Sequence, residues 1–164
     1  MADGWARLVV GRDPSRTLWR ALGLVAGGWL LVTYGILPVR GQGPSMAPTI
    51  ADGQLLIVSK LSYAWRAPRR GEVVAVRLAG DQAVLVKRIL AGPGDRIAID
   101  EGQVVVNDVA IAEPYVAHRA PWRMAETTLA PHQYFVVGDN RGMPMELHTM
   151  GTVEAGRLIG PVVW

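Results

Sequence analysis

The chain contains no cysteine, and this absence excludes two kinds of architecture. A disulfide framework needs paired cysteines, and a thiolate zinc site needs cysteine ligands. The three histidines, His118, His132 and His148, also lack the i, i+4 spacing of a helical metal-binding pair. The sequence therefore predicts neither a metal site nor a cofactor.

Clusters of positive charge are lacking as well. The formal net charge is only +3, and no block of lysine and arginine is interleaved with aromatic residues, as on a nucleic-acid-binding face. We therefore expect no nucleic-acid partner. The composition leaves the oligomeric state open.

One long apolar run stands out near the start of the chain. Residues 21–37 (ALGLVAGGWLLVTYGIL) carry no charge. With Leu18, Trp19 and a snorkelling Arg20, a helix here would approach the ~30 Å hydrocarbon core of a bilayer. The run exceeds the about 7–15 apolar residues of a cleaved signal, and no A-x-A site follows it. We predict a transmembrane anchor at residues 18–37; a buried core helix and a cleaved signal are the alternatives.

The charges that flank this run predict its orientation. Arginines dominate the N-terminal flank: Arg7, Arg12, Arg16 and Arg20 stand there against Asp3 and Asp13. The near C-terminal flank offers only Arg40. By the positive-inside rule, residues 1–17 are expected in the cytoplasm and residues 38–164 on the outer face of the inner membrane, after a single pass.

Beyond the apolar run the pattern changes to short strands bounded by turn residues. The predicted strands are residues 54–59, 72–78, 83–91, 96–100, 104–106, 109–111, 134–137 and 158–163. Asn107-Asp108 is a two-residue hairpin signal. The predicted fold is mainly β, an antiparallel domain behind one N-terminal helix.

A serine stands between two prolines in the segment 43–49, GPSMAPT. Proline fixes its own φ angle and restricts the residue before it, so Ser45 would be presented on stiff backbone. Such a segment could aim a hydroxyl and a backbone N–H at a substrate carbonyl. By itself, a segment rich in proline, serine and threonine is more typical of an ordinary loop.

Lys87 lies inside the predicted strand VLVKRIL. Alternation places it on one face with Leu85 and Ile89, while Arg88 points to the other face. Burial on an apolar face lowers the pKa of a lysine, and only the neutral amine can accept a proton from a serine hydroxyl. The alternative is a snorkelling lysine at a sheet edge.

A turn with the sequence GDNR, residues 138–141, follows the predicted strand YFVV. Its aspartate, Asp139, could pair with Arg88 and hold the strand that carries Lys87. In order along the chain, the apolar run, PSMAPTI, DGQLLIVSKLSY, RGEVVAVR, VKRILAGPGD, VVVND, GDNR and GTV together resemble the type I signal peptidases, the Ser/Lys leader peptidases.

This resemblance implies a membrane-bound serine endopeptidase that removes signal peptides from preproteins and cleaves after small residues. Ser45 would be the nucleophile and Lys87 its base. The residues implied for the oxyanion and the substrate are Gly43, Ser45, Met46, Leu85 and Val86. Those implied to support the dyad are Arg88, Asp139, Arg141, Glu146 and Thr149. The substrate would lie as an added strand between residues 41–44 and 84–86.

The sequence departs from the family pattern at two places. Gly43 stands where many members carry an additional oxyanion hydroxyl. After GDNR, Pro144 replaces a serine that contacts the lysine amine in the family, while Glu146 and His148 stand at an aspartate and an arginine. We expect Thr149 or a water to supply the missing contact to Lys87.

Three other functions fit parts of the sequence. One is a specialised peptidase for a pilin or a secretion-system subunit. Another is a membrane-anchored β-domain that binds signal segments without cutting them, which the changes at Gly43 and Pro144 favour. The third is a self-cleaving Ser–Lys regulator of the LexA type, which the apolar run argues against.

Overall fold

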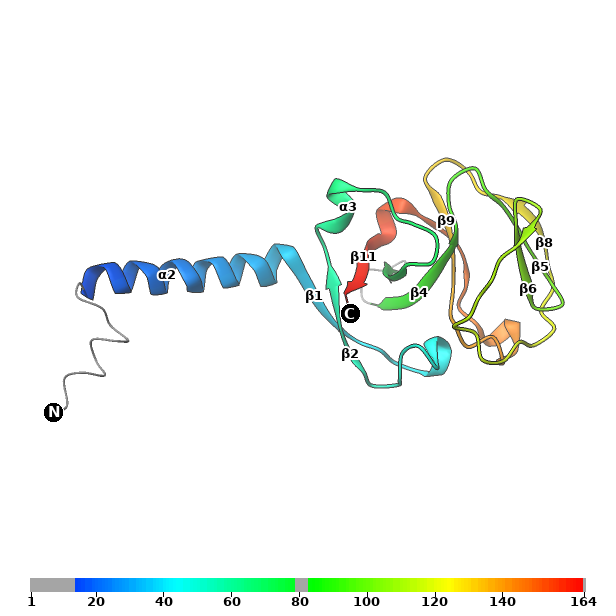
Figure 1. The fold of residues 1–164 in the computed structure, drawn as a ribbon, viewed down its shortest axis with the longest axis horizontal. Helices are drawn as coiled ribbons and strands as arrows, with labels where there is room; N and C mark the ends of the chain where they lie inside the picture. Colours follow the sequence, from blue (N-terminus) through cyan, green and yellow to red (C-terminus); the bar gives the residue numbers. More distant parts are fainter. Residues whose placement is uncertain (1–13, 79–82, 164) are drawn as a thin grey trace. The chain divides into compact units, whose positions relative to one another are not determined.

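A computed structural model of the chain describes residues 14–78 and 83–163. The chain divides into two units, residues Met1–Ile36 and Leu37–Trp164. Residues 14–35 of the first unit are helical, and the second consists mainly of strands (Figure 1). The predicted class, a mainly β fold behind an N-terminal helix, is confirmed.

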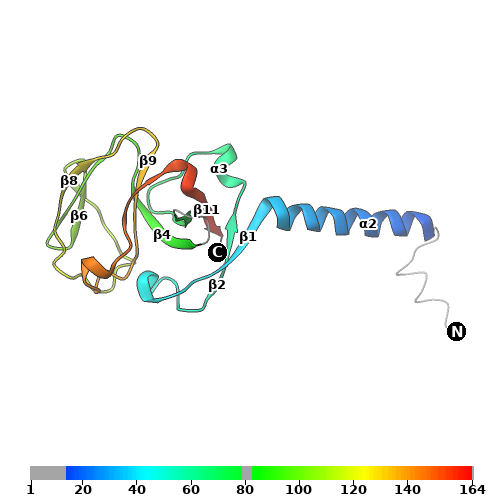
Figure 2. The same ribbon diagram turned by 180° about the vertical axis from the view of Figure 1, so that it is seen from behind.

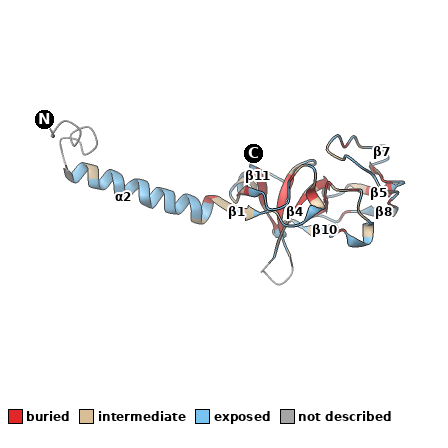
Figure 3. Ribbon diagram, turned by 90° about the horizontal axis from the view of Figure 1, so that it is seen from below, coloured by how far each residue is buried: buried red, intermediate tan, exposed pale blue. Residues whose placement is uncertain are grey.

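The N-terminal unit consists of the helix α2 (Pro14–Leu30), continued by a short π-helix, η1 (Leu31–Gly35). Proline is well suited to the first helical position because its missing N–H needs no partner there. The large apolar side chains of this unit are exposed, among them Leu24 (78%) and Val25 (71%) (Figure 3).

The structure does not support the prediction of a transmembrane helix at residues 18–37. In the part of the chain that the structure describes, no helix is both long enough and apolar enough to cross a membrane. Helical structure ends at Gly35, because Ile36 and Leu37 belong to the strand β1 (Ile36–Arg40). Arg7 and Arg12, used to predict the orientation, lie outside the described residues.

Seven strands of the C-terminal unit form one sheet in the order β1-β2-β11-β3-β4-β9-β10. After β1 its members are β2 (Leu55–Ser59), β3 (Val73–Arg77), β4 (Val84–Ala91), β9 (Gln133–Val137), β10 (Gly151–Glu154) and β11 (Leu158–Val163). Pro38 lies in β1, at the edge of the sheet, where a strand can tolerate a missing backbone donor.

A second sheet has the strand order β7-β6-β5-β8. Its strands are β5 (Arg96–Asp100), β6 (Gln103–Val106), β7 (Val109–Ala110) and β8 (Met124–Thr128). Seen from both sides, β6 and β8 lie beyond β9, away from β2 and β11 (Figures 1 and 2). The hairpin predicted at Asn107-Asp108 is confirmed: both residues have positive φ, 53° and 66°, as a type I′ turn requires.

Short helices interrupt the strands: η2 (Pro44–Met46), α3 (Ser62–Trp65), η3 (Met145–Leu147) and η4 (Ala155–Arg157). All eight predicted strands are present, with ends that differ by at most one residue. The sequence did not predict β1, β8 or β10. Each is short, and β8 is almost wholly exposed, so it lacks the alternation that marks a half-buried strand.

Candidate active site

Ser45 lies in the short 3₁₀ turn η2, held by apolar anchors on its C-terminal side. Met46 is 4% exposed and Ile50 2%, and both pack into a core cluster with Val58 and Val86. Before the turn, Gly43 has a φ of 81° and donates its N–H to Asp52 Oδ1 at 2.8 Å. The hydroxyl is therefore presented by a loop that is fixed at both ends.

Lys87 reaches Ser45 from the middle of β4, where it pairs with Val74 of β3. Its Nζ lies 2.8 Å from Ser45 Oγ, and the side chain is only 2% exposed. Burial lowers the pKa of Lys87 to about 8, although the Asp139 carboxylate acts in the opposite direction. The predicted burial of Lys87 is confirmed, and a pKa of about 8 leaves about a tenth of the amine neutral at pH 7.

Asp139 connects β4, the strand that carries Lys87, to the loop that carries Ser45 (residues 43–50, the nucleophile loop). Its fully buried carboxylate accepts two hydrogen bonds from Arg88, from Nε at 2.9 Å and from Nη2 at 2.6 Å. It also accepts one from Thr49 Oγ1 at 2.5 Å. The predicted Arg88–Asp139 pair is present, whereas sequence reasoning missed Thr49, which lies four residues after Ser45.

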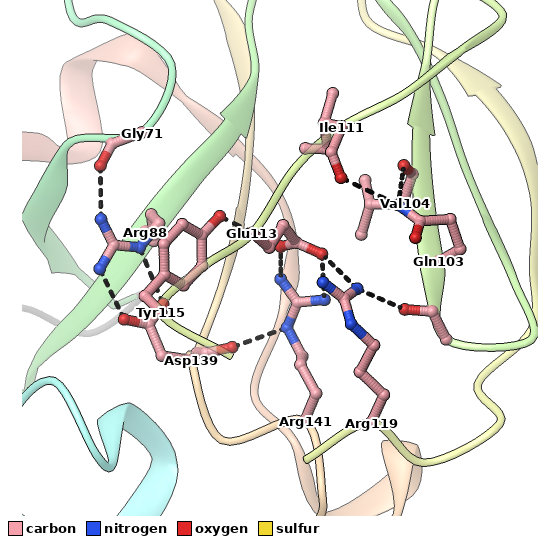
Figure 4. A network of polar contacts seen from close by, with 12 residues as sticks. Gly71, Arg88, Gln103, Val104, Ile111, Glu113, Tyr115, Arg119, Asp139 and Arg141 are labelled. Carbon is pink, nitrogen blue, oxygen red and sulfur yellow. Dashed lines mark hydrogen bonds and ion pairs between the residues drawn. The ribbon is translucent and has the colours of Figure 1, made fainter. Parts of the chain in front are cut away.

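The Arg88–Asp139 pair belongs to a larger polar network (Figure 4). The Arg88 guanidinium stacks 3.8 Å from the centre of the Tyr115 ring, and the Tyr115 hydroxyl donates to Glu113 Oε1. Glu113, 4% exposed, also accepts from Arg141 Nη2 at 2.5 Å. Sequence reasoning missed Glu113 and Tyr115, because nothing in their local pattern indicates that they meet the arginines.

An open groove of about 530 Å³ runs beside Ser45. Its lining includes Gly41, Gln42 and all five residues predicted to bind the oxyanion and the substrate, which are Gly43, Ser45, Met46, Leu85 and Val86. The structure thus brings these five positions together along one surface. Their roles stay predictions.

The chain matches the family model "Signal peptidase, peptidase S26" over residues 15–164. The chain belongs to this family. It is 30% identical to a probable signal peptidase I-2 of Synechocystis sp., over 90% of this chain and 73% of that protein. A signal peptidase I of Bacillus caldolyticus is 32% identical, over 74% of each chain. These relatives confirm the predicted class of enzyme, a serine endopeptidase of the signal peptidase I type.

One solved structure, a signal peptidase I from Enterococcus faecalis V583, matches 60% of this chain and 98% of its own, with a TM-score of 0.48 and 21% identity.

Two residues predicted to support Ser45 and Lys87 do not reach them. Glu146 and Thr149 are exposed, and no hydrogen bond among the described residues joins either one to Lys87. The reason is the 3₁₀ turn η3, which has about three residues per turn and places Met145 and His148 on its inner face. The structure therefore does not bring Thr149 to Lys87, and the alternative contact, a water, stays a prediction.

Arg141 is buried, 1% exposed, but its guanidinium donates a hydrogen bond to Glu113 and does not contact Lys87. The residue that points inward after η3 is His148, 7% exposed. Its Nε2 lies 2.8 Å from the backbone oxygen of Asn140. Neither His148 nor Asn140 was predicted to have a role of this kind.

Proposed function

We propose that this chain removes signal peptides from exported proteins, with Ser45 as nucleophile and Lys87 as general base. The observation that carries the proposal is the 2.8 Å contact between Ser45 Oγ and the Nζ of a lysine that is 2% exposed. A buried lysine with a pKa of about 8 matches the requirement that a base be deprotonated near the operating pH.

The proposed reaction follows from this contact. Neutral Lys87 accepts the Ser45 proton while Oγ attacks the scissile carbonyl carbon, and the Ser45 N–H donates to the oxyanion. The tetrahedral intermediate collapses as the Lys87 ammonium gives its proton to the leaving amine, which leaves an ester on Ser45. Lys87 then takes a proton from water, and the resulting attack releases the signal peptide and restores the serine.

The edge of β4 supports binding of the substrate as an extended strand. On one side, β4 pairs with β3, where Val84 lies opposite Arg77 and Val86 lies opposite Ala75. On the other side, the pairing of β4 with β9 begins only at Arg88. The other edge of residues 84–86 therefore faces the groove. Met46, Leu85 and Val86 line this groove, and their apolar side chains support binding of small residues before the scissile bond.

We also propose that the helical N-terminal unit associates with a lipid bilayer and holds the peptidase unit at the outer face of the membrane. The support is the run of exposed apolar side chains on α2 and η1, which water solvates poorly. The full chain should float with liposomes, whereas Leu24→Lys combined with Leu31→Lys should reduce flotation. Equal flotation of both proteins would contradict the proposal.

The proposed cleavage is tested with the full chain in detergent and a preprotein that carries alanine at the first and third positions before the bond. Mass spectrometry of the products should show cleavage after the first of these alanines. Cleavage should disappear in Ser45→Ala and in Lys87→Met, and persist in the control Lys60→Met. Cleavage by Ser45→Ala would overturn the assignment of the nucleophile, and intact preprotein with the wild type would overturn the function.

A further inference from the structure

The imidazole of His148 is enclosed on several sides. Its ring meets Trp122 edge-on, with the ring centres 4.9 Å apart, and it lies against the backbone of Gly138. A Cβ atom at Gly138 would overlap both His148 Cε1 and the backbone oxygen of Ser45. Gly138, in the GDNR turn, is therefore closely packed between His148 and the nucleophile loop.

The hydrogen bond of His148 defines its tautomer. A carbonyl oxygen only accepts, so Nε2 must be the nitrogen that donates to Asn140 O at 2.8 Å. Within the described residues, Nδ1 is buried without a partner. Burial lowers the pKa of His148, and the positive charges of Lys87 and Arg141 also lower it, although the hydrogen bond to Asn140 O acts in the opposite direction. The ring is therefore neutral and carries its proton on Nε2.

Asn140, the acceptor of this bond, donates two hydrogen bonds to the nucleophile loop. Its backbone N–H donates to Ser45 O at 3.1 Å. Its side-chain Nδ2 donates to Pro44 O, also at 3.1 Å. Asn140 thus binds the carbonyls on both sides of the Ser45 residue.

The bond to Pro44 O matters because that oxygen shares a peptide plane with the Ser45 N–H. This peptide bond is trans, so its C=O and N–H point in opposite directions. The Ala47 N–H also donates to Pro44 O, at 3.0 Å. With the carbonyl held by Ala47 and Asn140, the Ser45 N–H is aimed away from it. The Ser45 N–H donates no hydrogen bond within the described part of the chain, and Ser45 lines the groove.

We propose that His148 is a positioning residue for the oxyanion donor. By holding Asn140 O, it fixes the turn that orients the Pro44–Ser45 peptide. The inference rests on the proposed function, because it takes the Ser45 N–H as the donor to the oxyanion. It gives this chain a neutral hydrogen-bonding residue at a position where the resemblance implies an arginine.

The test compares kcat and KM for preprotein cleavage by the full chain with His148→Phe and His148→Gln. Phenylalanine keeps the bulk of the ring but cannot donate, whereas the glutamine amide can donate to Asn140 O. We expect His148→Phe to lower kcat about 10- to 100-fold with little change in KM, since a misplaced oxyanion donor acts in the transition state. We expect His148→Gln to recover most of that loss.

A third variant, Asn140→Ala, keeps the test decisive if a buried substitution at His148 prevents folding. It should lower kcat by a similar factor, and in a folded double variant with His148→Phe the two losses should not multiply. Three results would overturn the proposal: kcat within twofold of wild type in folded His148→Phe, equal losses in the phenylalanine and glutamine variants, or unchanged kcat in Asn140→Ala. If Ser45→Ala cleaves as well as wild type, the proposed function itself fails instead.

Discussion

Lys87 Nζ lies 2.8 Å from Ser45 Oγ, while the nearest carboxylate of the site, Asp139, is bound by Arg88 and Thr49. The lysine therefore has no ion-pair partner of its own among the described residues, and burial decides its pKa. This separation lets one buried carboxylate organise the site without holding Lys87 in its charged form.

The first prediction concerns pH. Because the pKa of Lys87 is about 8 and only the neutral amine is a base, kcat/KM should rise with pH and level off above this value. Below it, activity should fall about tenfold per pH unit, as for loss of a single essential base. The measurement is kcat/KM for preprotein cleavage between pH 6 and pH 10. A profile that is flat, or that falls as pH rises from 7 to 9, would exclude this role of Lys87.

Lys87→Met should abolish cleavage and yet stabilise the fold. The lowered pKa means that the folded protein disfavours the charged amine, so removing it should raise the free energy of unfolding by about 1–3 kcal/mol at pH 7. As pH rises from about 8 towards 10.5, the folded protein has lost the proton that the unfolded chain still holds. Wild type then gains stability, and the advantage of methionine should shrink.

Denaturant unfolding at pH 7 and pH 10 measures this difference. The matched control is Lys60→Met, which removes the other lysine of the chain and should not gain stability over wild type at pH 7. An Lys87→Met variant that is less stable than wild type at pH 7 would show that the buried amine is well solvated or paired.

Asp139→Asn should destabilise the protein strongly. The carboxylate is fully buried and neutralises Arg88, which is only 11% exposed, so its loss leaves a buried charge unpaired at a cost of about 3–5 kcal/mol. Asp108→Asn is the control, because Asp108 pairs with Arg96 but is 71% exposed, and such pairs contribute at most about 1 kcal/mol. Similar losses in both variants would contradict the importance assigned to Asp139.

Gly138→Ala should lower kcat about 100-fold or more, since a displacement of about 1 Å at a catalytic group has effects of this size. The added Cβ would overlap the Ser45 backbone oxygen and His148, so the nucleophile loop must move. Gly156→Ala is the control, because a Cβ there meets no atom within 4 Å. Wild-type kcat in Gly138→Ala would mean that the loop tolerates displacement.

Gly43→Ser would place a hydroxyl where many family members carry one, but we expect no gain in kcat. Gly43 has a φ of 81° and a ψ of 169°, a backbone conformation that is essentially restricted to glycine, and a side chain there costs about 1–3 kcal/mol. Gly43→Ala should show the same loss of stability without the hydroxyl. A serine variant with wild-type stability and higher kcat than both wild type and the alanine variant would show that the second oxyanion donor is missing here.

Much of the β-fold and the reactive pair could be predicted from local pattern. Alternation in VLVKRIL placed Lys87 on an apolar face, and the turn residues Asn107-Asp108 marked a hairpin. Both signals are local, since side-chain direction in a strand follows from a period of two and turn chemistry from two residues. The resemblance of the ordered motifs added the expected roles of Ser45 as nucleophile and Lys87 as base.

The sequence by itself determined the residue types of the site, the run of apolar residues and most of the strands. Only the tertiary structure decided which polar groups support the dyad. Thr49 meets Asp139 across 90 residues of chain and Asn140 meets Pro44 across 96, contacts that no local period encodes. The 3₁₀ turn η3 turned His148 inward and left Glu146 and Thr149 exposed, because position around a turn, rather than order in the sequence, selects the buried side chain.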